Sequence, residues 1–93
     1  GGTERTAWAL LQIYRRLVSL SLAVDGWVPF PFRQADLADA IGLSLVHTNR
    51  TLTVLRSRGL VEFSGRRMHV ADQHGLATVA DDDPERVPVR PLF

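Results

Sequence analysis

The 93-residue sequence contains no cysteine, no lysine and no long apolar run. The absence of cysteine excludes a disulfide framework, a thiolate metal site and a cysteine nucleophile, and it is compatible with the reducing cytoplasm. No apolar segment approaches the roughly 18 to 20 residues that cross a bilayer, and the first residues lack the pattern of a signal peptide. We therefore expect a soluble, cytoplasmic protein with no membrane partner.

Length and composition favour one small folded domain. Apolar residues make up 45% of the chain and charged residues 23%, an ordinary globular balance that argues against disorder. Domains commonly contain about 100 to 150 residues, so this chain provides one core and not two. The chain begins with Gly1-Gly2 and no methionine, and we expect it to be part of a longer protein.

Charge is distributed unevenly along the chain. Residues 1–80 contain nine arginines and six acids, a net charge of +3, whereas residues 81–93 contain four acids and two arginines, a net charge of −2. Between Ser44 and Val70, five arginines stand against the single acid Glu62, a local excess of +4. Such a stretch attracts a polyanion, which is the first electrostatic indication of function.

A first helix is predicted over residues 3–23. At about 100° per residue its polar side chains gather on one side, and apolar side chains cover more than half of the circumference. A helix on a small domain needs an apolar stripe of only about 100° to dock. The surplus favours contact with a further domain or a second subunit; the alternative is that the small core wraps the helix. Trp8 falls among the polar residues, either as an exposed interface residue or as a lid packed under a loop.

Residues 34–58 show the pattern of two helices joined by a tight turn. Apolar periodicity predicts a short helix over 34–41, which Gly42 ends in the left-handed conformation. Ser44 is a good N-cap for a second helix that runs to about Arg58. Two prolines in the preceding segment 28–32 forbid helix there and allow an extended edge strand.

A hairpin and a last helix follow. β-prone runs at 60–63 and 68–70 flank a turn at 64–66, and Asp72 can cap a short helix through Ala80. This order predicts an α+β, mainly α, winged helix-turn-helix with residues 60–70 as a small antiparallel β-sheet or hairpin wing. We assign residues 3–80 to this domain and expect the acidic, proline-containing tail 81–93 to be disordered or to lie loosely on its surface.

The second helix of this unit has an outer face that suits DNA. With Leu45 at 0°, the positions of Asn49, Val46 and Arg50 fall between about 40° and 140°, away from the core side. Asparagine and arginine read adenine and guanine bidentately in the major groove. We therefore expect sequence-specific, non-catalytic binding of double-stranded DNA, with base contacts from Leu45, Val46, Asn49 and Arg50.

The stretch F-R-Q-A-D-L-A-D-A-I-G-L-S-L-V-H-T-N-R-T-L-T-V-L-R-S-R-G-L-V resembles the DNA-binding domain of the Crp/Fnr transcription regulators. The likeness runs from about Arg5 to Ala71 and is specific over residues 34–61. It implies a homodimer on a palindromic operator, a sensor domain outside this chain that binds a small effector such as a cyclic nucleotide, and RNA polymerase as a further partner. It assigns a guanine contact to Arg50, a variable base contact to Asn49 and no cofactor to this domain.

The chain departs from the family pattern at three places. Leu45-Val46 stands where the family often has arginine and glutamate, so no carboxylate can accept from a cytosine there, and Val46 is left to touch a thymine methyl. Thr48 replaces a buried valine, and we expect its hydroxyl to bond to the Ser44 carbonyl. Arg33 replaces a threonine N-cap, which predicts different capping and more fraying.

Phosphate contacts are expected at the helix starts and the hairpin tip, by resemblance and by charge. The candidates are Gln34, Ser44, His47, Ser64, Gly65 and Arg66. Arg56 and Arg58 lie late in the second helix. Their positive charges there also suit the negative C-terminal end of the helix, and this alternative requires no role in DNA binding.

An enzyme and a protein-binding domain are the other classes of function that the sequence allows. His69, Asp72 and His74 have no fixed helical spacing, so they are a weak candidate for metal binding or acid–base catalysis, and we expect neither an enzyme nor a metal site. A winged helix that binds only proteins, or a DNA binder of another winged-helix family, is the alternative. A domain used only for protein contacts does not need Asn49, Arg50 or a basic wing.

Overall fold

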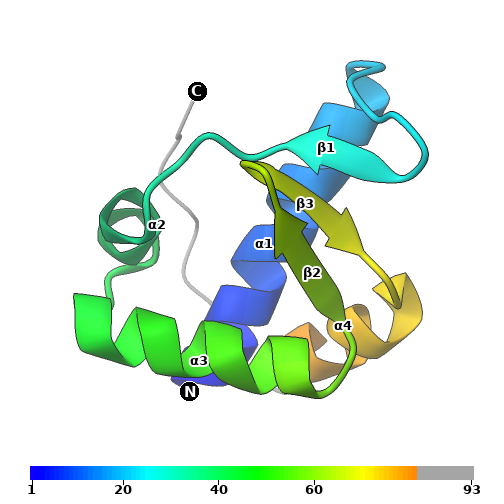
Figure 1. Cartoon of the computed structure of the whole chain (residues 1–93). Helices are drawn as coiled ribbons and strands as arrows, with labels where there is room; N and C mark the ends of the chain where they lie inside the picture. The colour runs from blue at the N-terminus through cyan, green and yellow to red at the C-terminus, as the bar shows by residue number, and fades with distance from the viewer. Residues whose placement is uncertain (82–93) are drawn as a thin grey trace.

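The computed structural model describes residues 1–81; of the predicted tail, residues 82–93 lie outside the described residues, and Asp81 belongs to the last helix. The elements are α1 (Gly2–Ser19), β1 (Trp27–Pro29), α2 (Gln34–Ile41), α3 (Leu45–Ser57), β2 (Val61–Ser64), β3 (Arg67–Val70) and α4 (Gln73–Asp81). Figure 1 shows α1 passing behind the sheet through the middle of the molecule, with α3 across one end. The predicted α+β, mainly helical fold with a small antiparallel sheet is confirmed.

The sheet is three-stranded, in the order β1-β3-β2, and both strand pairs are antiparallel. β2 and β3 form a hairpin whose two-residue turn, Gly65-Arg66, has positive φ at both positions (56° and 60°). Such a turn matches the right-handed twist of the strands. β1 joins the other edge of β3 and places Val28 opposite Met68, so the proline-containing segment forms an edge strand as predicted.

α1 ends at Ser19, four residues before the predicted boundary. Ser21 has a φ of 62°, so the backbone leaves the helix there. The chain then turns tightly at Asp25-Gly26, where Val24 and Trp27 form an antiparallel bridge. The Asp-Gly pair therefore closes a small hairpin and does not simply end the helix.

The wide apolar face of α1 is buried inside this domain. α4, α3, the sheet and α2 all pack against the helix, and eight of its residues are buried. The expectation that its surplus apolar surface points outside the domain is therefore wrong, because elements on several sides cover it. The exposed apolar side chains of this region lie instead at and beyond the end of the helix: Val18, Leu20, Leu22 and Val24.

Trp8 is half-buried and packs against the core. The unusual exposure expected of an interface residue is therefore wrong, and a lid describes the side chain better. A partner contact at Trp8 has no support from exposure.

α4 closes the domain against α1. Asp72 Oδ1 accepts the backbone N–H of Gly75 at 2.9 Å, which confirms the predicted cap. Leu76 and Ala80 bury the inner face of the helix. Within residues 1–81, no helix has the length and apolar character needed to cross a membrane.

Candidate nucleic-acid interface

The turn between α2 and α3 is set by Gly42 and supported from α1. Gly42 has a φ of 72°, where an L side chain costs about 1 kcal/mol or more, so the predicted left-handed glycine is confirmed. The backbone N–H of Leu43 donates to the Ala38 carbonyl at 3.0 Å. Arg5 Nη1 donates to the Ile41 carbonyl at 3.2 Å. The first helix thereby holds the end of α2.

Both helices of the unit are capped in their first turn. The backbone N–H of Arg33 donates to Asp36 Oδ2 at 2.9 Å, while the Arg33 side chain supplies no cap hydrogen bond. The predicted difference in capping at α2 is confirmed, and the Asp36 carboxylate also suits the positive end of the helix. At α3, Ser44 Oγ accepts the backbone N–H of His47 at 3.1 Å, as predicted for an N-cap.

Buried threonines join α1 to α3. Thr6 Oγ1 donates to the Gly2 carbonyl at 2.8 Å and lies 2.8 Å from Thr51 Oγ1. Thr51 Oγ1 also donates to the Thr48 carbonyl at 2.9 Å. The hydroxyls of Thr6 and Thr51 therefore have two protons between them for three contacts. Thr48 Oγ1 is buried and has no hydrogen-bond partner within the described part of the chain. Its predicted bond to the Ser44 carbonyl is therefore wrong; that carbonyl accepts the backbone N–H of Thr48 at 2.9 Å.

The outer face of α3 carries the four residues predicted to contact bases. Leu45, Val46, Asn49 and Arg50 are all exposed, with 70% of Val46 accessible, whereas the buried residues of α3 lie on the opposite side. The side chains of Asn49 and Arg50 make no hydrogen bond or ion pair with residues 1–81. Their donors and acceptors are therefore available to an outside partner.

The residues predicted to contact phosphates are likewise all exposed: Gln34, Ser44, His47, Ser64, Gly65 and Arg66. The His47 ring lies beside Gly2, in the first turn of α1. The two are so close that a Cβ added at Gly2 would be 2.6 Å from His47 Nε2. Arg66 Nη2 donates to the Pro31 carbonyl at 3.1 Å. The wing tip is thus tied to the segment that leads into α2.

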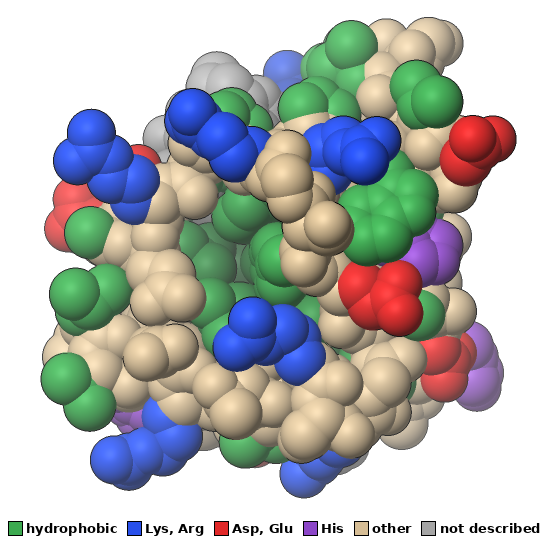
Figure 2. All heavy atoms as spheres, viewed as in Figure 1, with side chains coloured by type: hydrophobic (Ala, Val, Ile, Leu, Met, Phe, Trp, Pro, Cys, Tyr) green, Lys and Arg blue, Asp and Glu red, His purple; other side chains and the backbone are tan. Residues whose placement is uncertain are grey.

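Sequence reasoning missed a hollow between α2, α3 and the wing. Figure 2 shows basic side chains around a depression with hydrophobic side chains at its base. The hollow is lined by the aromatic residues Phe30, Phe32 and Phe63 and by the arginines Arg33, Arg56, Arg66 and Arg67. These residues come from separate parts of the chain, and the packing of both the hairpin and α2 against α3 brings them together. The F-P-F-R run before α2 is the sequence signal that points to it.

Two members of the cluster considered for catalysis, His69 and Asp72, are engaged in structural contacts. His69 Nδ1 lies 2.8 Å from the Gly26 carbonyl oxygen, and its ring lies against Trp27 with centroids 5.4 Å apart. Asp72 caps α4. Within residues 1–81, no group of three His, Cys, Asp or Glu side chains could hold a metal ion.

Comparison with known proteins agrees with this geometry. The model of the Crp-like helix-turn-helix domain family matches residues 4–79. FixK2 from Bradyrhizobium japonicum superposes with a TM-score of 0.72 and 32% identity, over 85% of this chain and 38% of that chain. Oxidized CprK in complex with o-chlorophenolacetic acid superposes with a TM-score of 0.65 and 20% identity, over 99% of this chain and 41% of that chain. No curated protein matches the sequence.

The two solved structures support different conclusions, because they differ in sequence identity to this chain. The likeness to CprK shows the fold alone, whereas FixK2 is similar in sequence as well, and this chain spans only about two fifths of either solved chain. The family model covers most of the chain, and this family consists of DNA-binding regulator domains. The chain therefore belongs to the Crp-like helix-turn-helix family and is a DNA-binding domain of a transcription regulator.

Proposed function

We propose that α3 enters the major groove of double-stranded DNA while the wing lies on the adjacent phosphate backbone. The observation that carries this proposal is the outer face of α3, where the side chains of Asn49 and Arg50 are exposed and have no hydrogen-bond or ion-pair partner within residues 1–81. An arginine on a helix surface is usually a solvated charge. Here it lies beside an asparagine on the second helix of a helix-turn-helix, the element that reads bases in such domains.

Each exposed residue of this face has a matching base edge. Arg50 pairs bidentately with guanine N7 and O6, and Asn49 suits adenine. Leu45 and Val46, 51% and 70% exposed, offer apolar surface to thymine methyl groups. The readout next to Val46 therefore favours thymine and places no acceptor against cytosine.

The phosphate contacts set affinity and register. Ser44 and His47 lie at the start of α3, where backbone N–H groups and the helix dipole favour an anion. Gln34 lies in the first turn of α2, and Ser64, Gly65 and Arg66 form the wing tip. These contacts act on any sequence, because phosphates are the same at every base pair.

The intact protein acts, in this proposal, as a cytoplasmic homodimer on a palindromic operator. Two recognition helices about 34 Å apart then enter successive major grooves on one side of the duplex. A separate sensor domain binds a small effector such as a cyclic nucleotide, this domain holds no cofactor, and RNA polymerase is a further partner.

Selection of duplexes from a random pool by this domain, followed by fluorescence anisotropy on the selected half-site, tests the proposal. Arg50→Ala is expected to weaken cognate binding by about 1 to 3 kcal/mol, roughly 5- to 150-fold, and to flatten the preference at one guanine. Arg58→Ala is the matched control, because Arg58 is an exposed arginine at the end of the same helix and away from the outer face. Unchanged discrimination in the Arg50 variant would refute the assignment.

A further inference from the structure

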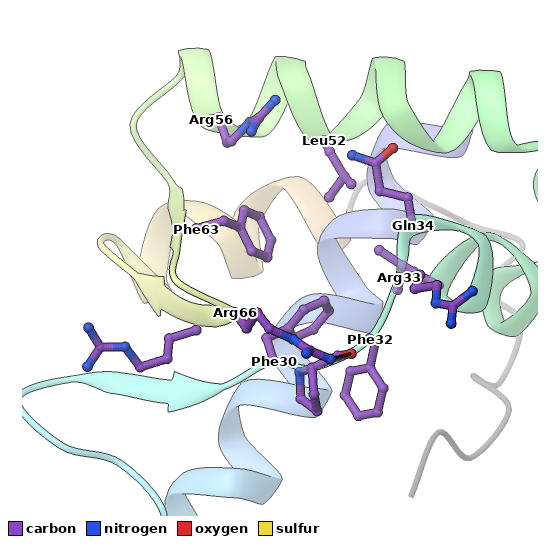
Figure 3. A pocket seen from close by; sticks show the side chains of 11 residues that line it. Phe30, Phe32, Arg33, Gln34, Leu52, Arg56, Phe63 and Arg66 are labelled. Atoms are coloured by element: carbon purple, nitrogen blue, oxygen red, sulfur yellow. Dashed lines mark hydrogen bonds between the residues drawn. The ribbon is translucent and has the colours of Figure 1, made fainter.

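The hollow between α2, α3 and the wing has an aromatic floor. Its volume is about 470 Å³, within the roughly 300 to 1,000 Å³ of ligand pockets. The Phe30 ring lies at the centre of an edge-to-face cluster, with centroid distances of 5.1 Å to Phe32 and 5.4 Å to Phe63. Phe63 is only half-buried, so a further ring can extend the cluster on its exposed side (Figure 3).

The rim of the hollow is cationic, and no acid is found among its lining residues in the described part of the chain. Two of its arginines have contacts within the domain: Arg66 donates to Pro31, and Arg67 lies 5.7 Å from the centre of the Trp27 ring. The side chains of Arg33 and Arg56 make no hydrogen bond or ion pair with residues 1–81. Two guanidinium groups, from the start of α2 and the end of α3, are therefore available to bind an anion bidentately.

We propose that this hollow binds a small aromatic anion, an arene that carries a carboxylate or a phosphate, and that occupation of the hollow weakens DNA binding. The ring packs on Phe63, and the anionic group pairs with Arg33 or Arg56. A DNA duplex alone does not account for the aromatic floor, because its bases are stacked and reach such a surface only when flipped out. The effect on DNA rests on the proposed function, in which Gln34 and Arg66, which also line the hollow, bind phosphates.

The first experiment measures ligand binding without DNA. The domain is titrated by calorimetry and by chemical-shift mapping with phenyl phosphate and benzoate, and in parallel with benzyl alcohol, acetate and inorganic phosphate at constant ionic strength. We expect each aromatic anion to bind at least about 10-fold more tightly than benzyl alcohol and than the matching non-aromatic anion, because both the ring and the charge contribute. Equal binding of phenyl phosphate and inorganic phosphate overturns the proposal, since the hollow is then a plain phosphate site. Absence of binding by both aromatic anions up to about 10 mM overturns it as well.

Substitutions at the rim and the floor locate the site. Arg56→Gln is expected to weaken binding of phenyl phosphate about 10-fold, since it removes a charge-assisted contact. Phe63→Leu is expected to reduce the preference for phenyl phosphate over inorganic phosphate, since it removes a ring from the floor. Arg58→Gln is the matched control, because Arg58 is exposed two residues further on and does not line the hollow. Equal losses in the Arg56 and Arg58 variants would indicate a general effect of charge and overturn the assignment.

The second experiment measures DNA binding with the hollow occupied. At saturating phenyl phosphate and constant ionic strength, we expect the Kd for a half-site duplex to rise at least about 5-fold in the unsubstituted domain and less in Arg56→Gln. Ligand binding with unchanged DNA affinity overturns the regulatory part of the proposal. If phenyl phosphate binds and no duplex does, the proposed function fails together with the regulatory part, whereas the ligand site stands.

Discussion

Substitution of Thr48 by valine is expected to stabilise the domain. Thr48 has no exposed surface, and its hydroxyl oxygen lacks a partner within residues 1–81. Leaving a buried polar group without a partner costs about 1 to 3 kcal/mol. Valine has nearly the same shape and the same branching at Cβ, so the packing of α3 is kept. We therefore expect Thr48→Val to raise the free energy of unfolding by about 1 to 3 kcal/mol.

Thr51→Val is the matched control, because the substitution and the helix are the same and Thr51 is equally buried, with 2% of its surface exposed. This variant loses the contacts of the Thr51 hydroxyl with Thr6 and with the Thr48 carbonyl. Thr6 keeps its hydrogen bond to the Gly2 carbonyl. We expect Thr51→Val to lower the free energy of unfolding by about 1 to 2 kcal/mol.

Urea denaturation followed by circular dichroism measures both changes. The midpoints are expected to move in opposite directions with an unchanged dependence on urea, and each 1 kcal/mol corresponds to about 4 to 8 °C in Tm for a domain of this size. DNA affinity is expected to stay the same in Thr48→Val, because the side chain does not reach the outer face of α3. Destabilisation by both substitutions would refute the reasoning, since it would mean that a buried water satisfies the Thr48 hydroxyl.

Three further predictions concern the interface. Arg66→Ala is expected to weaken binding to all duplexes alike and to reduce the slope of log K against log salt by about one, measured by anisotropy over a salt series; a sequence-selective loss would contradict a phosphate contact. The isolated domain is expected to bind a half-site only weakly, because it lacks a second tethered recognition helix about 34 Å away, and nanomolar binding of a palindrome by a monomer would show otherwise. Gly42→Ala is expected to lower the free energy of unfolding by about 1 kcal/mol or more, and an unchanged urea midpoint would argue against backbone strain at the turn.

Local chemistry could be predicted from the sequence at several positions. Gly42, Ser44 and Asp72 act on backbone groups within a few residues, so their roles as a turn residue and as caps follow from residue type and spacing. The turn predicted at residues 64–66 is local in the same sense, although the structure keeps Ser64 in β2 and turns at Gly65-Arg66. Each of these predictions agrees with the structure.

Tertiary contacts could not be predicted in this way. Periodicity shows how wide the apolar face of α1 is, but it does not show which elements cover it, and for this reason it leaves open whether Trp8 is exposed or packed as a lid. The Thr48 hydroxyl is buried without a partner in a helix that packs against α1, and helical spacing alone does not show these surroundings. The arginine-rimmed hollow depends on how the hairpin packs against α3, which no local pattern encodes.

The position of α1 in the chain affects how the domain folds during synthesis. Of the described elements α1 is made first, and α4, the element packed most extensively on it, is made last. Until the ribosome reaches α4, the apolar surface of α1 lacks its main cover, and contacts between such distant segments form slowly. This interval is when aggregation or chaperone binding competes with folding. Premature termination before Leu76 therefore leaves a chain with all of the residues proposed to contact DNA and an open core.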